Sequence, residues 1–221
     1  MWGAIIGDLA GSIYEYRQYK NVSLINVDKI ITEDSFYSDD TILTIAIYDA
    51  ILNDRSYEDC LREYGNKFLN YKPQTKILEH FKTTFGGGFA RWLKGQNDGT
   101  SIGNGAMMRI SGVGKMFNIE SEVIDNAILA TIPSHNSKEA IECAQKIALI
   151  IYYARIGFTK IDILQSLGIA SLSYKPFESF NKTCYETIDN CLYAVFCSNN
   201  FEDAIRTIIS MGGIQIQMQL L

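Results

Sequence analysis

Four adjacent residues, Ser38-Asp39-Asp40-Thr41, combine two carboxylates with two hydroxyls. An apolar segment follows them directly and predicts a helix that runs to about Leu52. Asp39 or Asp40 could cap this helix, because a short oxygen side chain accepts the unpaired amides of the first turn. Capping needs only one carboxylate, and the repulsion between two neighbours is usually offset by a cation such as Mg²⁺, which prefers oxygen ligands. An acidic cap and a metal half-site are therefore both consistent with this stretch.

A second polar stretch, Gly103-Asn104-Gly105, opens another apolar segment that is expected to be helical. Free backbone amides at a helix N-terminus suit a phosphate, and glycines let the ligand approach closely. The spacing is neither a Walker loop nor a Gly-x-Gly-x-x-Gly fingerprint, and no strand precedes it. A plain glycine turn explains the same residues.

His135 stands between Pro133 and a long helix expected at about residues 137–156. A lone histidine before a helix is more often a cap or a satisfied core residue than a ligand. With only one other histidine in the chain, a histidine-rich zinc site is not expected.

The chain begins with a segment that predicts an amphipathic helix. Asp8, Ser12 and Glu15 form a polar track along one side. Apolar residues recur at helical spacing and are expected to face the core. These residues are Trp2, Ile5, Ile6, Leu9 and Ile13.

The rest of the chain is also expected to be helical, since apolar periodicity dominates and there are only three prolines. Residues 18–36 lack periodicity and are expected to form a loop. The alternating residues 214–221 are strand-like, although no sheet is expected. Further helices are expected after Ser56 and at about residues 73–82, 120–131, 160–167, 183–197 and 201–210.

Composition restricts the class of protein. The chain of 221 residues, 47% hydrophobic and 20% charged, suits a single globular domain over residues 1–221. A net charge of −5 without a basic cluster argues against nucleic acid, and no uncharged run approaches the length of a membrane span. Five scattered cysteines without a Cys-x-x-Cys pair indicate reduced thiols in a cytoplasmic protein.

Taken in order, four motifs resemble the ADP-ribosylglycohydrolase family, which includes the dinitrogenase reductase-activating glycohydrolases. The likeness covers essentially the whole chain, and serine replaces the family's usual threonine at residue 38. The motifs are the opening segment of residues 3–15, Ser38-Asp39-Asp40-Thr41, Gly103-Asn104-Gly105-Ala106-Met107-Met108-Arg109, and Ser134-His135-Asn136.

This resemblance implies an all-α, compact orthogonal helical bundle with two Mg²⁺ ions in a central cleft. It implies hydrolysis of an N- or O-glycosidic bond between ADP-ribose and a protein side chain, so the partner is an ADP-ribosylated protein or ADP-ribose. Ser38, Asp39 and Asp40 would supply metal ligands, and Glu15 would act beside them as a gating or acid–base carboxylate. Gly103, Asn104, Gly105 and Met107 would line the diphosphate and ribose pocket, with His135 at its border. Mn²⁺ would suit the same oxygen ligands.

The chain departs from the family at its C-terminal end, where Ile214 follows Gly212-Gly213. The family places Gly-Gly-Asp-x-Asp-Thr and an apolar helix here, which complete the metal site. A reading frame one base upstream can encode Asp-Thr-Asp-Thr-Asn-Ala over the same stretch, so a frameshift and a genuine divergent tail are both open. Without this second motif, we expect at most one ion to be held well, and activity to be strongly reduced or absent.

Two further consequences follow from the missing motif. Loss of the terminal helices is expected to expose apolar surface and to favour dimerisation or poor solubility. A protein that binds ADP-ribose without catalysis, or an inactive relic, is the competing hypothesis. A plain helical scaffold would not explain four motifs in the family's order.

Overall fold

The computed structural model describes residues 1–18, 27–73, 75, 83–174 and 182–211. In these residues the regular secondary structure is helical, apart from two isolated β-bridges. The all-α prediction is therefore confirmed. The helices in chain order are α1 (Trp2–Gln18), α2 (Asp39–Leu52), α3 (Tyr57–Lys67), α4 (Gly87–Leu93), α5 (Gly105–Met108), α6 (Ser111–Met116), α7 (Glu120–His135), α8 (Lys138–Arg155), α9 (Lys160–Ser166), α10 (Cys184–Cys197) and α11 (Phe201–Ser210).

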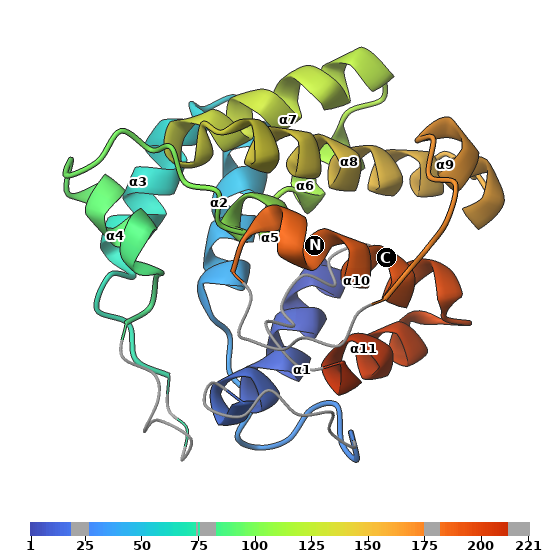
Figure 1. The fold of residues 1–221 in the computed structure, drawn as a ribbon. Coiled ribbons are helices and arrows are strands. Elements are labelled where there is room, and N and C mark those ends of the chain that lie inside the picture. The colour runs from blue at the N-terminus through green and yellow to red at the C-terminus, as the bar shows by residue number, and fades with distance from the viewer. Residues whose placement is uncertain (19–26, 74, 76–82, 175–181, 212–221) are drawn as a thin grey trace.

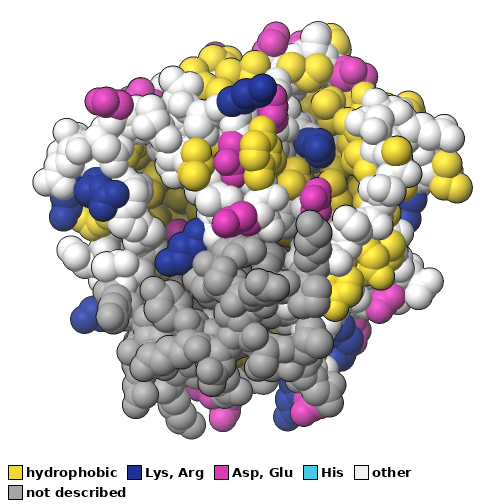
Figure 2. Space-filling model, in the orientation of Figure 1, with side chains coloured by type: hydrophobic (Ala, Val, Ile, Leu, Met, Phe, Trp, Pro, Cys, Tyr) yellow, Lys and Arg dark blue, Asp and Glu magenta, His cyan; other side chains and the backbone are white. Residues whose placement is uncertain are grey.

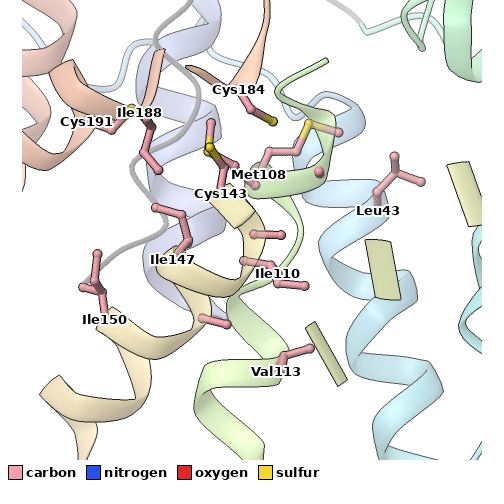
Figure 3. Close-up of a cluster of buried hydrophobic side chains, with 14 of the residues drawn as sticks. Leu43, Met108, Ile110, Val113, Cys143, Ile147, Ile150, Cys184, Ile188 and Cys191 are labelled. Carbon is pink, nitrogen blue, oxygen red and sulfur yellow. The ribbon is translucent and has the colours of Figure 1, made fainter. Parts of the chain in front are cut away.

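The helices pack in a bundle around one apolar core. The antiparallel pair α7 and α8 lies side by side across the top of Figure 1, and α2, α6 and α10 lie beneath it. Figure 3 shows side chains from four parts of the chain converging in this core, including Leu43, Ile110, Ile147 and Ile188. The short α5 and α6 are thus held between longer helices, and the loop before α5 is anchored to the core.

The orientation of α1 agrees with the prediction at Ile13, which is 3% exposed, but differs at the other apolar positions. Trp2 is 73% exposed, and Ile5, Ile6 and Leu9 are only partly buried. The buried side instead carries the polar track, with Asp8 0%, Ser12 1% and Glu15 8% exposed. Hydrogen bonds from residues 36–41 offset the cost of burying Asp8 and Ser12, whereas Oε2 of Glu15 has no hydrogen-bond partner among the described residues. The polar side of α1 therefore faces the interior of the protein.

Two helix ends also differ from the prediction. α7 continues through Pro133 to His135, so the histidine ends this helix as well as lying just before α8, which begins at Lys138. Proline here removes only the hydrogen bond to the carbonyl of Leu129, a residue that is 51% exposed, so water can replace it. The helix after the Gly-Asn-Gly stretch is also shorter than expected, because α5 has only four residues.

Helices α2, α3, α8, α9, α10 and α11 agree with the predictions, whereas α4 forms in a glycine-rich stretch that was not expected to be helical. α3 begins after Ser56, and α8, α9, α10 and α11 lie within the expected ranges. Most of the helix expected at residues 73–82 lies outside the described residues, as do the proposed frameshift and the strand-like tail at 214–221. Part of the expected loop, residues 27–36, is described and contains no helix.

The surface drawn in Figure 2 carries interspersed acidic and basic side chains, with hydrophobic side chains gathered on the side where α9 lies. Exposed apolar residues near this helix include Ile156, Phe158 and Ile161. None of the helices in the described part of the chain combines the length and apolar character that a membrane crossing requires.

Candidate functional site

Asp8 connects α1 to the start of α2. Its Oδ2 accepts hydrogen bonds from Ser38 N at 2.8 Å, Thr41 N at 3.1 Å and Thr41 Oγ1 at 2.6 Å. Its Oδ1 accepts a fourth hydrogen bond, from Ser38 Oγ at 2.7 Å. A fully buried carboxylate with four donors is well compensated for the loss of water. Asp8 therefore holds the Ser38–Thr41 segment in place from a different helix.

This arrangement corrects the predicted cap of α2. Ser38, and neither of the aspartates, is the N-cap residue, and its Oγ lies 3.4 Å from Asp40 N. Asp8 accepts the next amide, that of Thr41. Since these two residues accept the amides of Asp40 and Thr41, the carboxylate of Asp40 is not needed as a cap, while the carboxylate of Asp39 accepts its own backbone amide. Both carboxylates remain available for another role.

The carboxylates of Glu15, Asp39 and Asp40 form a cluster with Asp8 in which burial and like-charge repulsion raise their pKa values. Burial and the charge of Asp8 raise the pKa of Asp39 to about 7. Burial and the neighbouring carboxylates raise the pKa of Asp40 well above its ordinary value. Burial, and then the charges of Asp39 and Asp8, raise the pKa of Glu15 well above its ordinary value, while the charge of Lys182 opposes this shift. The raised pKa values indicate that the surrounding protein does not fully compensate the negative charges of these carboxylates.

This donor set fits one hard cation. Oδ1 of Asp40 and Oε2 of Glu15 are buried oxygens that have no hydrogen-bond partner within the described ranges. The same ranges contain no group of three or more histidine, cysteine, aspartate or glutamate side chains that could hold a metal ion. Mg²⁺ can bind through one or two carboxylates while it keeps several waters. Ser38, Asp39 and Asp40 therefore fit a single hydrated ion.

The Gly-Asn-Gly loop is held by the segment that leads into α10. Asn104 N donates to Lys182 O at 2.8 Å, and Cys184 N donates to Ile102 O at 3.0 Å. The thiol of Cys184 lies 3.2 Å from Gly103 O. Lys182 thus holds the loop with its backbone, while its side-chain charge acts on Glu15. This residue links the two parts of the predicted site.

His135 lies against the same loop. A β-carbon added to Gly105 would lie 3.1 Å from His135 Nε2, and one added to Gly103 would lie 3.7 Å from it. The glycines are required here because a side chain would fill the space in front of the ring. Met107, which was also expected to line the pocket, is 2% exposed and belongs to the hydrophobic core.

Sequence analysis did not assign a role to Asp8 or to Arg109. The signal for Asp8 was its spacing of seven residues from Glu15, which places both on one side of α1. Arg109 is fully buried, and its Nη2 donates to Ala130 O at 3.2 Å and Ser134 Oγ at 2.9 Å. An arginine that follows an apolar helical turn gives no sequence signal for these contacts.

Comparison with known proteins identifies the family of this chain. Residues 1–214 match the ADP-ribosylglycohydrolase family, and the chain belongs to this family. It is similar to ADP-ribosylarginine hydrolase Tri1 of Pseudomonas putida (strain GB-1), with 21% identity over 234 aligned positions that cover 92% of this chain and 62% of that protein. The chain thus spans less than two thirds of the length of this curated relative.

The fold also matches a solved structure. This is a chain of an ADP-ribosylglycohydrolase-related protein complex, with a TM-score of 0.74 and 18% sequence identity. The match covers 99% of this chain and 81% of the other. At this identity, the likeness shows that the two chains share an all-α fold.

Proposed function

We propose that this protein is a hydrolase that removes ADP-ribose from modified protein side chains by cleaving an N- or O-glycosidic bond. The observation that carries the proposal is the buried carboxylate cluster at the junction of α1 and α2. Ser38 and Asp8 accept the amides of Asp40 and Thr41, so neither amide needs an aspartate cap and both carboxylates can serve chemistry. Membership of the ADP-ribosylglycohydrolase family supports the same reaction.

Mg²⁺ is the proposed cofactor, with Ser38, Asp39 and Asp40 as its ligands and Mn²⁺ as a suitable substitute. When bound, the ion would polarise ribose oxygens and activate a water. With Ser38, Asp39 and Asp40 as the protein ligands, we expect one well-held ion at most and impaired activity. Dimerisation through exposed apolar surface remains a prediction.

The other residues of the site would each have a separate role in binding or proton transfer. Burial and the charges of Asp39 and Asp8 raise the pKa of Glu15 well above its ordinary value, so its carboxyl group would serve as the proton donor to the leaving group. A β-carbon added to Gly105 would lie 3.1 Å from His135 Nε2, so the glycines let the loop lie close to this ring, and the diphosphate or ribose would bind beside both. The amides of the loop would orient the ligand through backbone hydrogen bonds.

Release of ADP-ribose from peptides modified on arginine or serine tests the proposal. We expect slow release that requires Mg²⁺, and a loss of at least about 100-fold in Asp39→Asn and Asp40→Asn. Asp59→Asn is a matched control, since Glu58 and Asp59 form an exposed acidic pair in the first turn of α3 after the Ser56 cap. Release that chelator and both site variants leave unchanged would contradict the proposal.

The expected impairment has a test of its own. We expect a variant in which Asp-Thr-Asp-Thr-Asn-Ala and the family's terminal helix follow Gly213 to release ADP-ribose faster than this chain. Equal rates would contradict the expected impairment. The nucleotide sequence across codons 212–221 decides separately between a frameshift and a genuine tail.

A protein that binds ADP-ribose without cleaving it is the second candidate. The observation in its favour is that the described residues contain no group of three or more histidine, cysteine, aspartate or glutamate side chains that could hold a metal ion. Calorimetric titration with ADP-ribose separates the two candidates. Binding that weakens in chelator favours the hydrolase, whereas binding without turnover, in either buffer, favours the binding protein.

A further inference from the structure

The buried guanidinium of Arg109 contacts the C-terminal part of α7. Its Nη2 donates to Ser134 Oγ at 2.9 Å and to Ala130 O at 3.2 Å. Its Nε and Nη1 have no hydrogen-bond partner in the described segments. A guanidinium can only donate hydrogen bonds, so the hydroxyl of Ser134 is the acceptor in this contact.

The direction of the Arg109–Ser134 hydrogen bond limits the direction of the hydrogen bond between Ser134 and His135. Ser134 Oγ lies 2.8 Å from His135 Nδ1. The hydroxyl already accepts from Arg109 and has one hydrogen of its own to donate. Among the described residues that Ser134 Oγ contacts, His135 Nδ1 is the atom that can accept this hydrogen. Nδ1 is therefore the ring nitrogen without a hydrogen.

The histidine ring is neutral at physiological pH. Burial, and then the positive charge of Arg109, lower the pKa of His135 well below its ordinary value. A neutral imidazole carries one hydrogen, on one of its two nitrogens. If Nδ1 accepts a hydrogen bond, the hydrogen is on Nε2.

Nε2 is the atom that faces the Gly-Asn-Gly loop. Of the atoms near a β-carbon added to Gly105, His135 Nε2 is the nearest, at 3.1 Å, and the same nitrogen lies 3.7 Å from a β-carbon added to Gly103. An N–H group at this position suits an oxygen of a phosphate or a ribose hydroxyl, which can accept a hydrogen bond.

We propose that Arg109 and Ser134 are positioning residues that hold His135 as its Nε2–H tautomer and so direct a hydrogen-bond donor at a ligand oxygen between Gly103 and Gly105. The identity of the ligand as ADP-ribose rests on the proposed function. The tautomer does not, because it is a property of the free protein.

Nitrogen-15 NMR of the imidazole tests the tautomer directly. The chain has two histidines, and His80→Gln leaves His135 as the only signal. We expect one tautomer in this background, with the hydrogen on Nε2. Ser134→Ala should give a mixture of both tautomers, and Ser134→Thr should restore the single form, because threonine keeps the hydroxyl.

Arg109→Met tests the direction of the contact. Without the guanidinium, both lone pairs of the Ser134 hydroxyl are free, so it can accept a hydrogen bond from Nδ1–H as well as donate one to Nδ1. The spectrum should then show both tautomers. If this variant does not fold, the Ser134 pair still decides the proposal.

Thr131→Val is the matched control for these variants. Thr131 lies one turn earlier in α7 and is fully buried, and its hydroxyl has no hydrogen-bond partner among the described residues. Its loss should leave the tautomer unchanged. An Nδ1–H form in the His80→Gln background, or a Ser134→Ala spectrum equal to that background, would overturn the proposal.

Titration with ADP-ribose tests whether Nε2–H of His135 donates a hydrogen bond to the ligand. We expect the Nε2 resonance to shift on binding, and affinity to fall roughly three- to tenfold in Ser134→Ala but not in Thr131→Val. An unshifted Nε2 resonance in a saturated sample would overturn the donor role. If the wild-type chain does not bind ADP-ribose, the proposed function fails and the ligand half of this inference fails with it, while the tautomer result stands.

Discussion

Thr41 on α2 donates a hydrogen bond from its Oγ1 to Oδ2 of Asp8 on α1 over 2.6 Å. The same carboxylate oxygen accepts the amide of Thr41 at 3.1 Å, so one residue of α2 is held by both its backbone and its side chain. These contacts join residues 33 positions apart in the chain. The orientation of the Asp39 and Asp40 carboxylates thus depends on a residue in another helix.

Asp8→Ala should destabilise the protein by about 3–5 kcal/mol, because it leaves buried donors of Ser38 and Thr41 without an acceptor. Denaturant unfolding measures this cost. Asp125→Ala, at an exposed position on α7, is the control and should stay within about 0.5 kcal/mol of wild type. Equal stability of the two variants would show that Asp8 does not hold the start of α2.

The titration of Asp39 predicts how stability depends on pH when chelator is present. Burial first, and then the charge of Asp8, raise the pKa of Asp39 from 3.8 to about 7 in the folded chain. Between these values the folded state keeps a proton that the unfolded state has lost. This contribution to stability is therefore full below about pH 4 and disappears as the pH rises through about 7.

Thermal unfolding at a series of pH values checks this prediction. In chelator, the Tm of Asp39→Asn should exceed that of wild type at about pH 8, and the advantage should shrink toward about pH 5, because asparagine does not titrate in this range. Mg²⁺ should raise the Tm of wild type at the higher pH, since the ion binds the ionised carboxylate. A difference between variant and wild type that does not change with pH would contradict the assignment.

Alanine substitutions at two glycines distinguish the cost of backbone strain from the cost of steric overlap. Gly99 and Gly95 have similar positive φ angles of +69° and +67°. A β-carbon at Gly99 would lie 2.3 Å from Pro133 O, whereas one at Gly95 would have no neighbour within 4 Å. Gly95→Ala should therefore cost about 1–2 kcal/mol, and Gly99→Ala at least about 2 kcal/mol more, in denaturant unfolding. Similar costs would indicate that the backbone near His135 can move away.

Gly105→Ala tests the space in front of His135. The added methyl group would lie 3.1 Å from Nε2 and 3.3 Å from Cε1 of the ring. We expect calorimetry to show ADP-ribose affinity reduced roughly tenfold, with a smaller effect on stability. Gly86→Ala is the control, because a β-carbon there meets nothing within 4 Å. Unchanged affinity in Gly105→Ala would place the ligand elsewhere.

The sequence by itself predicted the all-α class, most helix positions and the family. Apolar periodicity is a local property, so α8, α10 and α11 could be placed from the spacing of their residues. The motifs around Asp39, Gly103 and His135 could be recognised for the same reason, since each occupies a few adjacent residues.

Only the tertiary structure decided which side of α1 is buried and what surrounds the motifs. Hydrophobic periodicity predicted a buried Trp2, yet Asp8 is buried and Trp2 is exposed, because Asp8 gains four hydrogen bonds from residues at least 30 positions away. The position of Arg109 beside Ser134, 25 residues later, is decided in the same way. Such contacts depend on how helices pack against each other, and no local pattern of residues encodes them.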